Sequence, residues 1–190
     1  MTAVLPPLRT ALARGVRLTM AVGLVALGAW LVVDAEAVRT VEATSSASVV
    51  GALTSSETYR APGTSSFYWL MGTSEARGLR ITSECSVAYV LGPLLAMCGL
   101  LSLLRRLPAR RMVAAAAAGA ALIACVNLLR ISMVAVAVTR FPSDQAMWWW
   151  HVVIGSLVSL AGVGVGLALT TRVAFGGRGR PRRPHPGLEP

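Results

Sequence analysis

Four apolar runs alternate with polar or basic segments along this chain. They cover residues 18–33, 85–104, 112–138 and 148–170. A helix needs about 20 predominantly apolar residues to cross the hydrocarbon core of a membrane. The pattern therefore predicts an all-α integral membrane protein with four transmembrane helices.

The segments between the runs differ in charge, and this difference predicts their orientation. Twelve of the 18 arginines fall in residues 1–17, 105–111 and 171–190, together with a single acidic residue. Because arginine accumulates on the cytoplasmic side of membranes, both chain ends are predicted to be cytoplasmic. The outer segments are then residues 34–84 and 139–147, and the Gly- and Pro-rich tail 171–190 is predicted to be a disordered cytoplasmic segment.

The first apolar run has two interpretations. Small residues around Val33, Ala35 and Ala37 would suit cleavage of a signal peptide. The run is long for the apolar region of such a peptide, which favours a membrane anchor. Either interpretation places residues 34–84 outside.

Residues 34–84 are polar, rich in Ser, Thr and Gly, and show no clear period. Within them, Phe67–Met71 is too short to span a membrane and suits an interfacial dip or a lid over the membrane mouth. Residues Leu79–Thr82 alternate in polarity and are compatible with an extended segment.

Composition supports the membrane class and limits the partners. The chain is 55% hydrophobic and 14% charged, with a formal charge of +10. Such a charge can indicate nucleic-acid binding, but the arginines are divided among three separate inner segments. This distribution favours membrane topology and contact with anionic lipids at the cytoplasmic face over nucleic acid.

The cysteines and histidines predict neither a disulfide framework nor a metal or cofactor site. Three cysteines do not form the even set that such a framework needs, and no bridge to Cys85 is expected. Neither a metal cluster nor a phosphate loop is present in the sequence, and His185 is isolated in the tail.

The third apolar run contains Arg130, whose charge is unfavourable inside a membrane. A charge at membrane depth costs about 2.5–3.5 kcal/mol on insertion scales and usually faces a bundle interior or a wet cavity. Asn127 lies three residues earlier, on the same helical face. One polar spot is therefore predicted to face neighbouring helices.

Two further chemically distinctive residues are predicted at the depth of Arg130. Cys85 lies at the outer start of the second run, and His151 at the outer start of the fourth. Taken singly, Cys85 could be an apolar filler, His151 part of an aromatic belt, and Arg130 a lipid-phosphate ligand. Their shared level favours one site instead.

Thiol, imidazole and guanidinium groups together suit acyl transfer from a peptide bond. A thiolate is a strong nucleophile, and a histidine can take its proton and return it to a leaving amine. A nearby arginine can stabilise negative charge on an attacked carbonyl oxygen. The predicted location of this chemistry is the outer membrane face.

Three motifs in this order resemble the exosortase/archaeosortase family of membrane cysteine transpeptidases. They are Cys85-Ser86, then Asn127-Leu128-Leu129-Arg130-Ile131, then His151-Val152-Val153-Ile154-Gly155. The resemblance implies Cys85 as nucleophile, His151 as general acid and base, and Arg130 as stabiliser of the oxyanion or substrate. Asn127, Ser86 and Gly155 would support them.

The resemblance also implies a substrate and a location. Family members are understood to cut a C-terminal sorting signal made of a short motif, a transmembrane helix and a basic cluster. They act at the outer face of the plasma or inner membrane, and the new carboxyl end passes to an acceptor.

Two further functions are compatible with parts of this pattern. In a simple protease, water would resolve the thioester. In a non-enzymatic membrane subunit, Asn127 and Arg130 would bind a partner helix or anionic lipid. A small transporter is disfavoured, because neither a broken inverted repeat nor a second intramembrane charge is visible.

Overall fold

The computed structural model describes residues 8–104 and 107–176, and most of them are helical. Residues 1–7 of the predicted N-terminal segment, Arg105 and Arg106 of the predicted basic loop, and residues 177–190 of the predicted tail lie outside the described residues. The elements are α1 (Leu8–Val33), α2 (Ala35–Thr54), β1 (Thr58–Arg60), β2 (Ser66–Trp69), β3 (Arg77–Arg80), η1 (Ser83–Cys85), α3 (Ala88–Ser102), α4 (Ala109–Arg140), α5 (Asp144–Trp148), η2 (Trp149–Ile154) and α6 (Gly155–Phe175).

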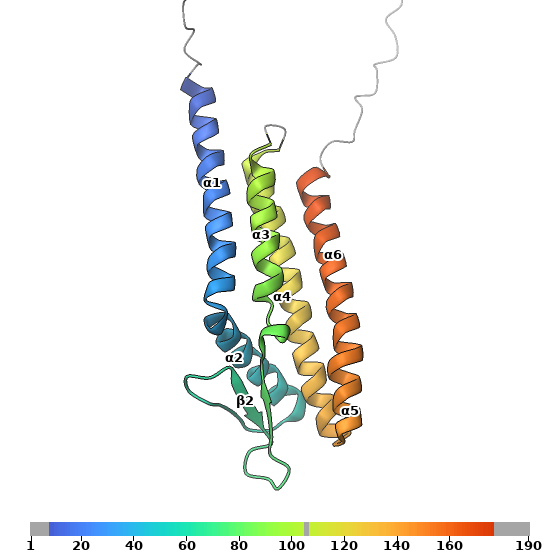
Figure 1. Cartoon of the computed structure of the whole chain (residues 1–190). Helices are drawn as coiled ribbons and strands as arrows, with labels where there is room; N and C mark the ends of the chain where they lie inside the picture. The colour runs from blue at the N-terminus through green and yellow to red at the C-terminus, as the bar shows by residue number, and fades with distance from the viewer. Residues whose placement is uncertain (1–7, 105–106, 177–190) are drawn as a thin grey trace, which may run out of the picture.

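The four longest apolar helices lie side by side as a bundle (Figure 1). α1 packs on α3, α3 on α4, and α4 on α6. Three segments are long and apolar enough to cross a membrane, namely Arg14–Val33, Ala109–Arg140 and Asp144–Phe175. The helical membrane class is thus supported. The count of four spans stays a prediction, because the 15 residues of α3 reach only about 22 Å.

Small residues bring the paired helices together, as expected of membrane helix contacts. A Cβ on Gly28 of α1 would lie 2.5 Å from the Gly92 carbonyl oxygen of α3. On α6, a Cβ on Gly162 would lie 2.4 Å from a methyl group of Val126, and a Cβ on Gly166 would lie 2.6 Å from Cγ1 of Ile123. Glycine is therefore favoured at these contacts, because a larger side chain would displace the facing backbone or side chain.

Residues 34–84, for which the sequence showed no period, fold into α2 and a small antiparallel sheet. The strand order is β1-β2-β3, with Phe67 of β2 paired with Arg60 and Leu79. Only β3 overlaps the alternating segment expected to be extended. The sheet packs on α2, so this part of the chain forms a compact unit against the bundle.

The aromatic patch at Phe67–Met71 is divided between two environments. Phe67 and Trp69 are buried, whereas Tyr68 between them is exposed, because alternate strand residues point to opposite faces. The buried rings pack with residues of α2 and α4, and the Trp69 indole donates a hydrogen bond to the Thr139 hydroxyl at 2.8 Å. These two rings lie inside the protein and not in an interfacial dip.

The bundle has two unlike ends. Figure 1 shows α2, the sheet, η1 and α5 at one end, and the start of α1, the end of α3, the start of α4 and the end of α6 at the other. Arg14, Arg17, Arg110, Arg111 and Arg172 belong to helix ends on the second side. The described parts of the segments predicted to be cytoplasmic therefore lie at one end of the bundle, and their orientation in a membrane stays a prediction.

The α1–α3 contact predicts a stability difference between two glycine substitutions. Gly28→Ala should lower the stability by about 1–3 kcal/mol, because the new methyl group overlaps the Gly92 carbonyl. Gly23→Ala is the matched control, since nothing lies within 4 Å of a Cβ there. Thermal unfolding of both variants in the same detergent measures the effect, and equal midpoints would contradict this account of the contact.

Candidate active site

Cys85 is held at the sheet end of the bundle by a short turn. It is the last residue of η1, and its backbone N–H donates to the Thr82 carbonyl at 3.1 Å. The residue is buried among side chains of the sheet, α2 and α4, including Trp69 and Ile131. The sequence run 85–104 is thus not one helix, because the cysteine precedes α3 on a 3₁₀ turn.

His151 lies on η2, a π-helical turn between α5 and α6. Single π turns widen a helix locally and are frequent at functional sites. The His151 Nε2 atom lies 3.7 Å from the Cys85 Sγ atom. The imidazole is therefore within contact distance of the thiol, from another part of the bundle.

Arg130 comes from α4 and completes the group. Its Nη2 lies 3.9 Å from Cys85 Sγ, and the residue is only 8% exposed. Gly155 leaves the space it occupies, since a Cβ there would lie 3.0 Å from Arg130 Nε. Within the described residues no carboxylate lies within salt-bridge distance of Arg130. The salt bridge found among these residues joins Arg39 and Glu36.

Asn127 and Ser86 support the backbone of the cysteine. The Asn127 side-chain amide donates to the Cys85 carbonyl at 3.0 Å. Ser86 is buried, and its hydroxyl accepts a hydrogen bond from the Ala88 N–H at 3.3 Å. All six residues singled out in the sequence are therefore brought together at one place.

Glu42 of α2 also belongs to this site, although sequence reasoning missed it. Its Oε1 accepts hydrogen bonds from Asn127 Nδ2 at 2.6 Å and from the Val87 N–H at 2.9 Å. Burial raises the pKa of the Glu42 carboxyl, and the hydrogen bond from Val87 opposes that shift. The other oxygen, Oε2, is buried and has no hydrogen bond of good geometry. The nearby Ser86 hydroxyl nevertheless lowers the pKa of the Glu42 carboxyl and so also opposes the effect of burial.

A weak signal for Glu42 was present in the sequence. The residues that α2 buries include Ala35, Ala43, Ala47 and Val50, which recur at helical spacing. Small residues among many serines and threonines give little contrast in hydropathy. The sequence therefore predicts no helix here, and little in it distinguishes Glu42 from the other acids of residues 34–84.

Two cavities differ in their relation to these residues. One of about 80 Å³ lies between α3, α4 and α6, is lined by Cys85, Asn127, Arg130 and Ser159, among others, and is large enough for a few water molecules or a small substrate group. His151 does not line it; with Cys85 and Arg130 it lines a separate space of about 10 Å³.

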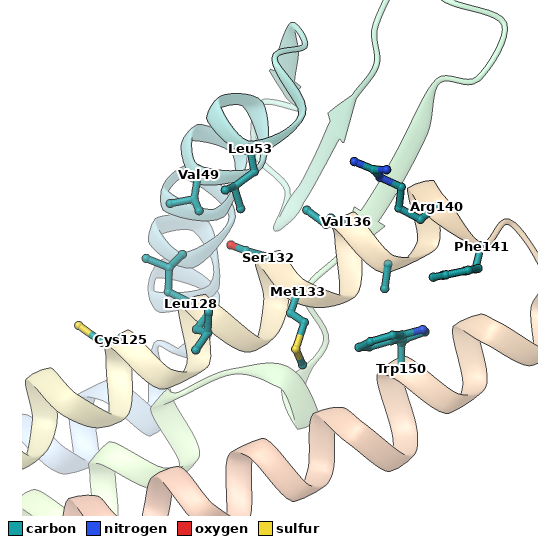
Figure 2. Close-up of a pocket in the computed structure, with 12 residues that line it drawn as sticks. Val49, Leu53, Cys125, Leu128, Ser132, Met133, Val136, Arg140, Phe141 and Trp150 are labelled. Atoms are coloured by element: carbon teal, nitrogen blue, oxygen red, sulfur yellow. The ribbon is translucent and has the colours of Figure 1, made fainter.

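A larger apolar groove, of about 530 Å³, lies elsewhere. Figure 2 shows it along α4, bordered by Leu53 of α2 and by Trp150. Neither Cys85, Arg130 nor His151 lines this groove, because Leu128, Ser132 and Val136 occupy another face of α4. The larger groove is therefore separate from the group around Cys85.

The two remaining cysteines lie apart from this group. Cys98 is buried between helices and Cys125 is exposed, and all three thiols are free. Among the described residues no group of three or more His, Cys, Asp or Glu side chains could hold a metal ion.

Residues 70–169 match the sequence model of the transmembrane exosortase family. The chain belongs to this family. The matched range includes Cys85, Asn127, Arg130 and His151, but it excludes Glu42. Comparisons with curated proteins and with solved structures found no match.

The site geometry predicts unusual thiol reactivity for this exosortase-family protein. In variants that each retain one cysteine, Cys85 should react faster than the more exposed Cys125 with a water-soluble alkylating reagent, because His151 can accept its proton. His151→Ala should slow the Cys85 reaction at least about tenfold and leave Cys125 unchanged. Mass spectrometry of timed samples gives the rates. Slower reaction at Cys85 than at Cys125, unaffected by His151→Ala, would contradict activation of this thiol.

Proposed function

We propose that this protein is a membrane cysteine transpeptidase that cleaves the C-terminal sorting signal of exported proteins through a thioester. The observation that supports the proposal most is the position of Cys85 Sγ, 3.7 Å from His151 Nε2 and 3.9 Å from Arg130 Nη2. A nucleophile, a proton acceptor and a fixed positive charge are the parts that acyl transfer needs.

The first half of the reaction forms the acyl-enzyme. His151 takes the thiol proton, and the Cys85 thiolate attacks the scissile carbonyl carbon. Arg130 stabilises the negative charge on the carbonyl oxygen, in a setting where burial strengthens the interaction. The tetrahedral intermediate collapses to a thioester, and His151 returns its proton to the leaving amine.

The second half releases the new carboxyl end. An acceptor amine or hydroxyl loses a proton to His151 and attacks the thioester carbon, and the Cys85 thiolate leaves and regains that proton. The products are a transferred acyl group and the starting enzyme. If water is the acceptor, the same steps make the protein a protease.

The family and the two ends of the bundle support a proposal for the substrate and the location. We infer substrates that carry a short C-terminal motif, a transmembrane helix and a basic cluster. Cys85, the last residue of η1, lies at the end opposite the arginine-bearing helix ends, and this supports a reaction at the outer face of the plasma or inner membrane. The arginines would contact anionic lipids at the cytoplasmic face.

The alternative of a non-enzymatic subunit fits the structure less well. In that function Asn127 and Arg130 would offer their polar groups to a partner helix or a lipid. Arg130 is instead buried, and Asn127 donates to groups of the protein itself. Nothing in their contacts favours an outside partner.

Processing in cells tests the proposal. With a co-expressed protein that ends in an apolar helix and an arginine cluster, Cys85→Ala should abolish cleavage, so that the uncut form accumulates. Cys98→Ala is the matched control, because this buried thiol is remote from His151 and Arg130. Immunoblots of membrane fractions measure both forms. Cleavage that persists in Cys85→Ala would contradict the proposal.

The role of Arg130 gives a second prediction. Arg130→Lys keeps the charge but removes the planar guanidinium, so processing should fall at least about 100-fold while the protein still inserts. Initial cleavage rates and the amount of membrane-inserted protein should both be measured. If lysine supports the wild-type rate, the guanidinium geometry is not required and a simple charge suffices.

A further inference from the structure

We propose that Glu42 is a positioning residue that sets the backbone of Cys85 by accepting hydrogen bonds from both Asn127 and Val87. The inference rests on the proposed function, since it concerns how the nucleophile is held. Glu42 lies on α2, outside the residues that match the exosortase family.

The contacts of Glu42 connect three elements around the nucleophile. Its Oε1 accepts from Asn127 of α4 at 2.6 Å and from the Val87 N–H, just before α3, at 2.9 Å. Asn127 Nδ2 also donates to the Cys85 carbonyl at 3.0 Å. One carboxyl oxygen therefore restrains the main chain on both sides of Ser86.

The Val87 hydrogen bond also satisfies a group that would otherwise be costly. Val87 is buried and precedes the first turn of α3, where backbone N–H groups have no partner within the helix. An unpaired buried donor costs about 1–3 kcal/mol. Glu42 removes that cost only if the turn keeps its present conformation, so the contact favours this conformation over others.

This restraint matters because the proposed reaction depends on the exact position of the Cys85 thiol. Its Sγ must stay near both His151 and Arg130, which belong to different helices. Productive sites need their groups held within about 0.5 Å, and an error of about 1 Å can cost about 100-fold in rate. A rotation of the Cys85–Ser86 peptide would move the thiol away from one partner or the other.

Glu42 acts through other residues and not on the substrate. Its hydrogen bonds go to Asn127 and Val87, and neither joins it to Cys85 Sγ or to His151. The role requires an oxygen that accepts hydrogen bonds, and it does not require a negative charge. An amide oxygen in the same place should therefore serve as well.

Steady-state kinetics of purified full-length variants with a cleavable substrate test this role. Glu42→Ala should lower kcat about 10–100-fold with KM changed by less than about twofold, because the nucleophile and not substrate binding is disturbed. Glu42→Gln should restore most of the kcat. Ser46→Ala is the matched control one turn along α2, because Ser46 is also buried and its hydroxyl has no hydrogen-bond partner among the described residues. It should match the wild type.

A double-mutant comparison separates positioning from general destabilisation. If Glu42 acts through Asn127, Glu42→Ala should reduce kcat less in an Asn127→Ala background than in the wild type. Independent effects, a wild-type kcat in Glu42→Ala, a change in KM alone, or a Gln variant as poor as the Ala variant would each overturn the inference. The failure of the proposed function looks different, because Cys85→Ala would then cleave as well as the wild type.

Discussion

The buried guanidinium of Arg130 constrains the structure around Cys85, because the rest of the helix bundle is mostly apolar. Arg130 is 8% exposed and has no carboxylate within salt-bridge distance among the described residues. A charge so placed is expensive unless its surroundings are polar and well fitted. The surroundings here are a thiol, a glycine that leaves room and a π-helical turn, all supplied by other elements. Those same surroundings make up the proposed catalytic group.

The small sheet and α2 give this polar group a covering of protein. Phe67, Trp69 and Ile81 are almost completely buried and pack with Cys85 and Ile131 in one cluster. Without that cover, water would reach the thiol and weaken its interaction with the guanidinium. Residues 34–84 thus enclose the proposed site, with packed side chains and with the hydrogen bonds that Glu42 accepts.

Helix packing by small residues explains how His151 and Arg130 are held at the same depth in the bundle. In a membrane, apolar side chains gain little by leaving lipid for a neighbouring helix, so close approach and shape decide the contacts. Gly155, Gly162 and Gly166 set α6 directly against α4, with Val126 and Ile123 filling the spaces. The depth of His151 relative to Arg130 is determined by this contact, because sliding one helix would make side chains overlap.

The sequence by itself determined the membrane class, the approximate apolar helices, the family and the residues gathered around Cys85. Apolar runs of membrane length are strong local patterns in the sequence. An arginine or a cysteine within such a run is easily recognised. The orientation and the count of four spans rest on the arginine distribution and on run length, and they stay predictions.

Only the tertiary structure decided the fold of residues 34–84, the 3₁₀ turn that carries Cys85 and the place of Glu42. The serines and threonines of α2 have weak helix propensity and low contrast, and strands of three or four residues carry little pattern. Glu42 and Asn127 are 85 positions apart, and their hydrogen bond exists because the helices pack. Local patterns identify which residues are unusual, whereas packing between distant segments decides which of them meet.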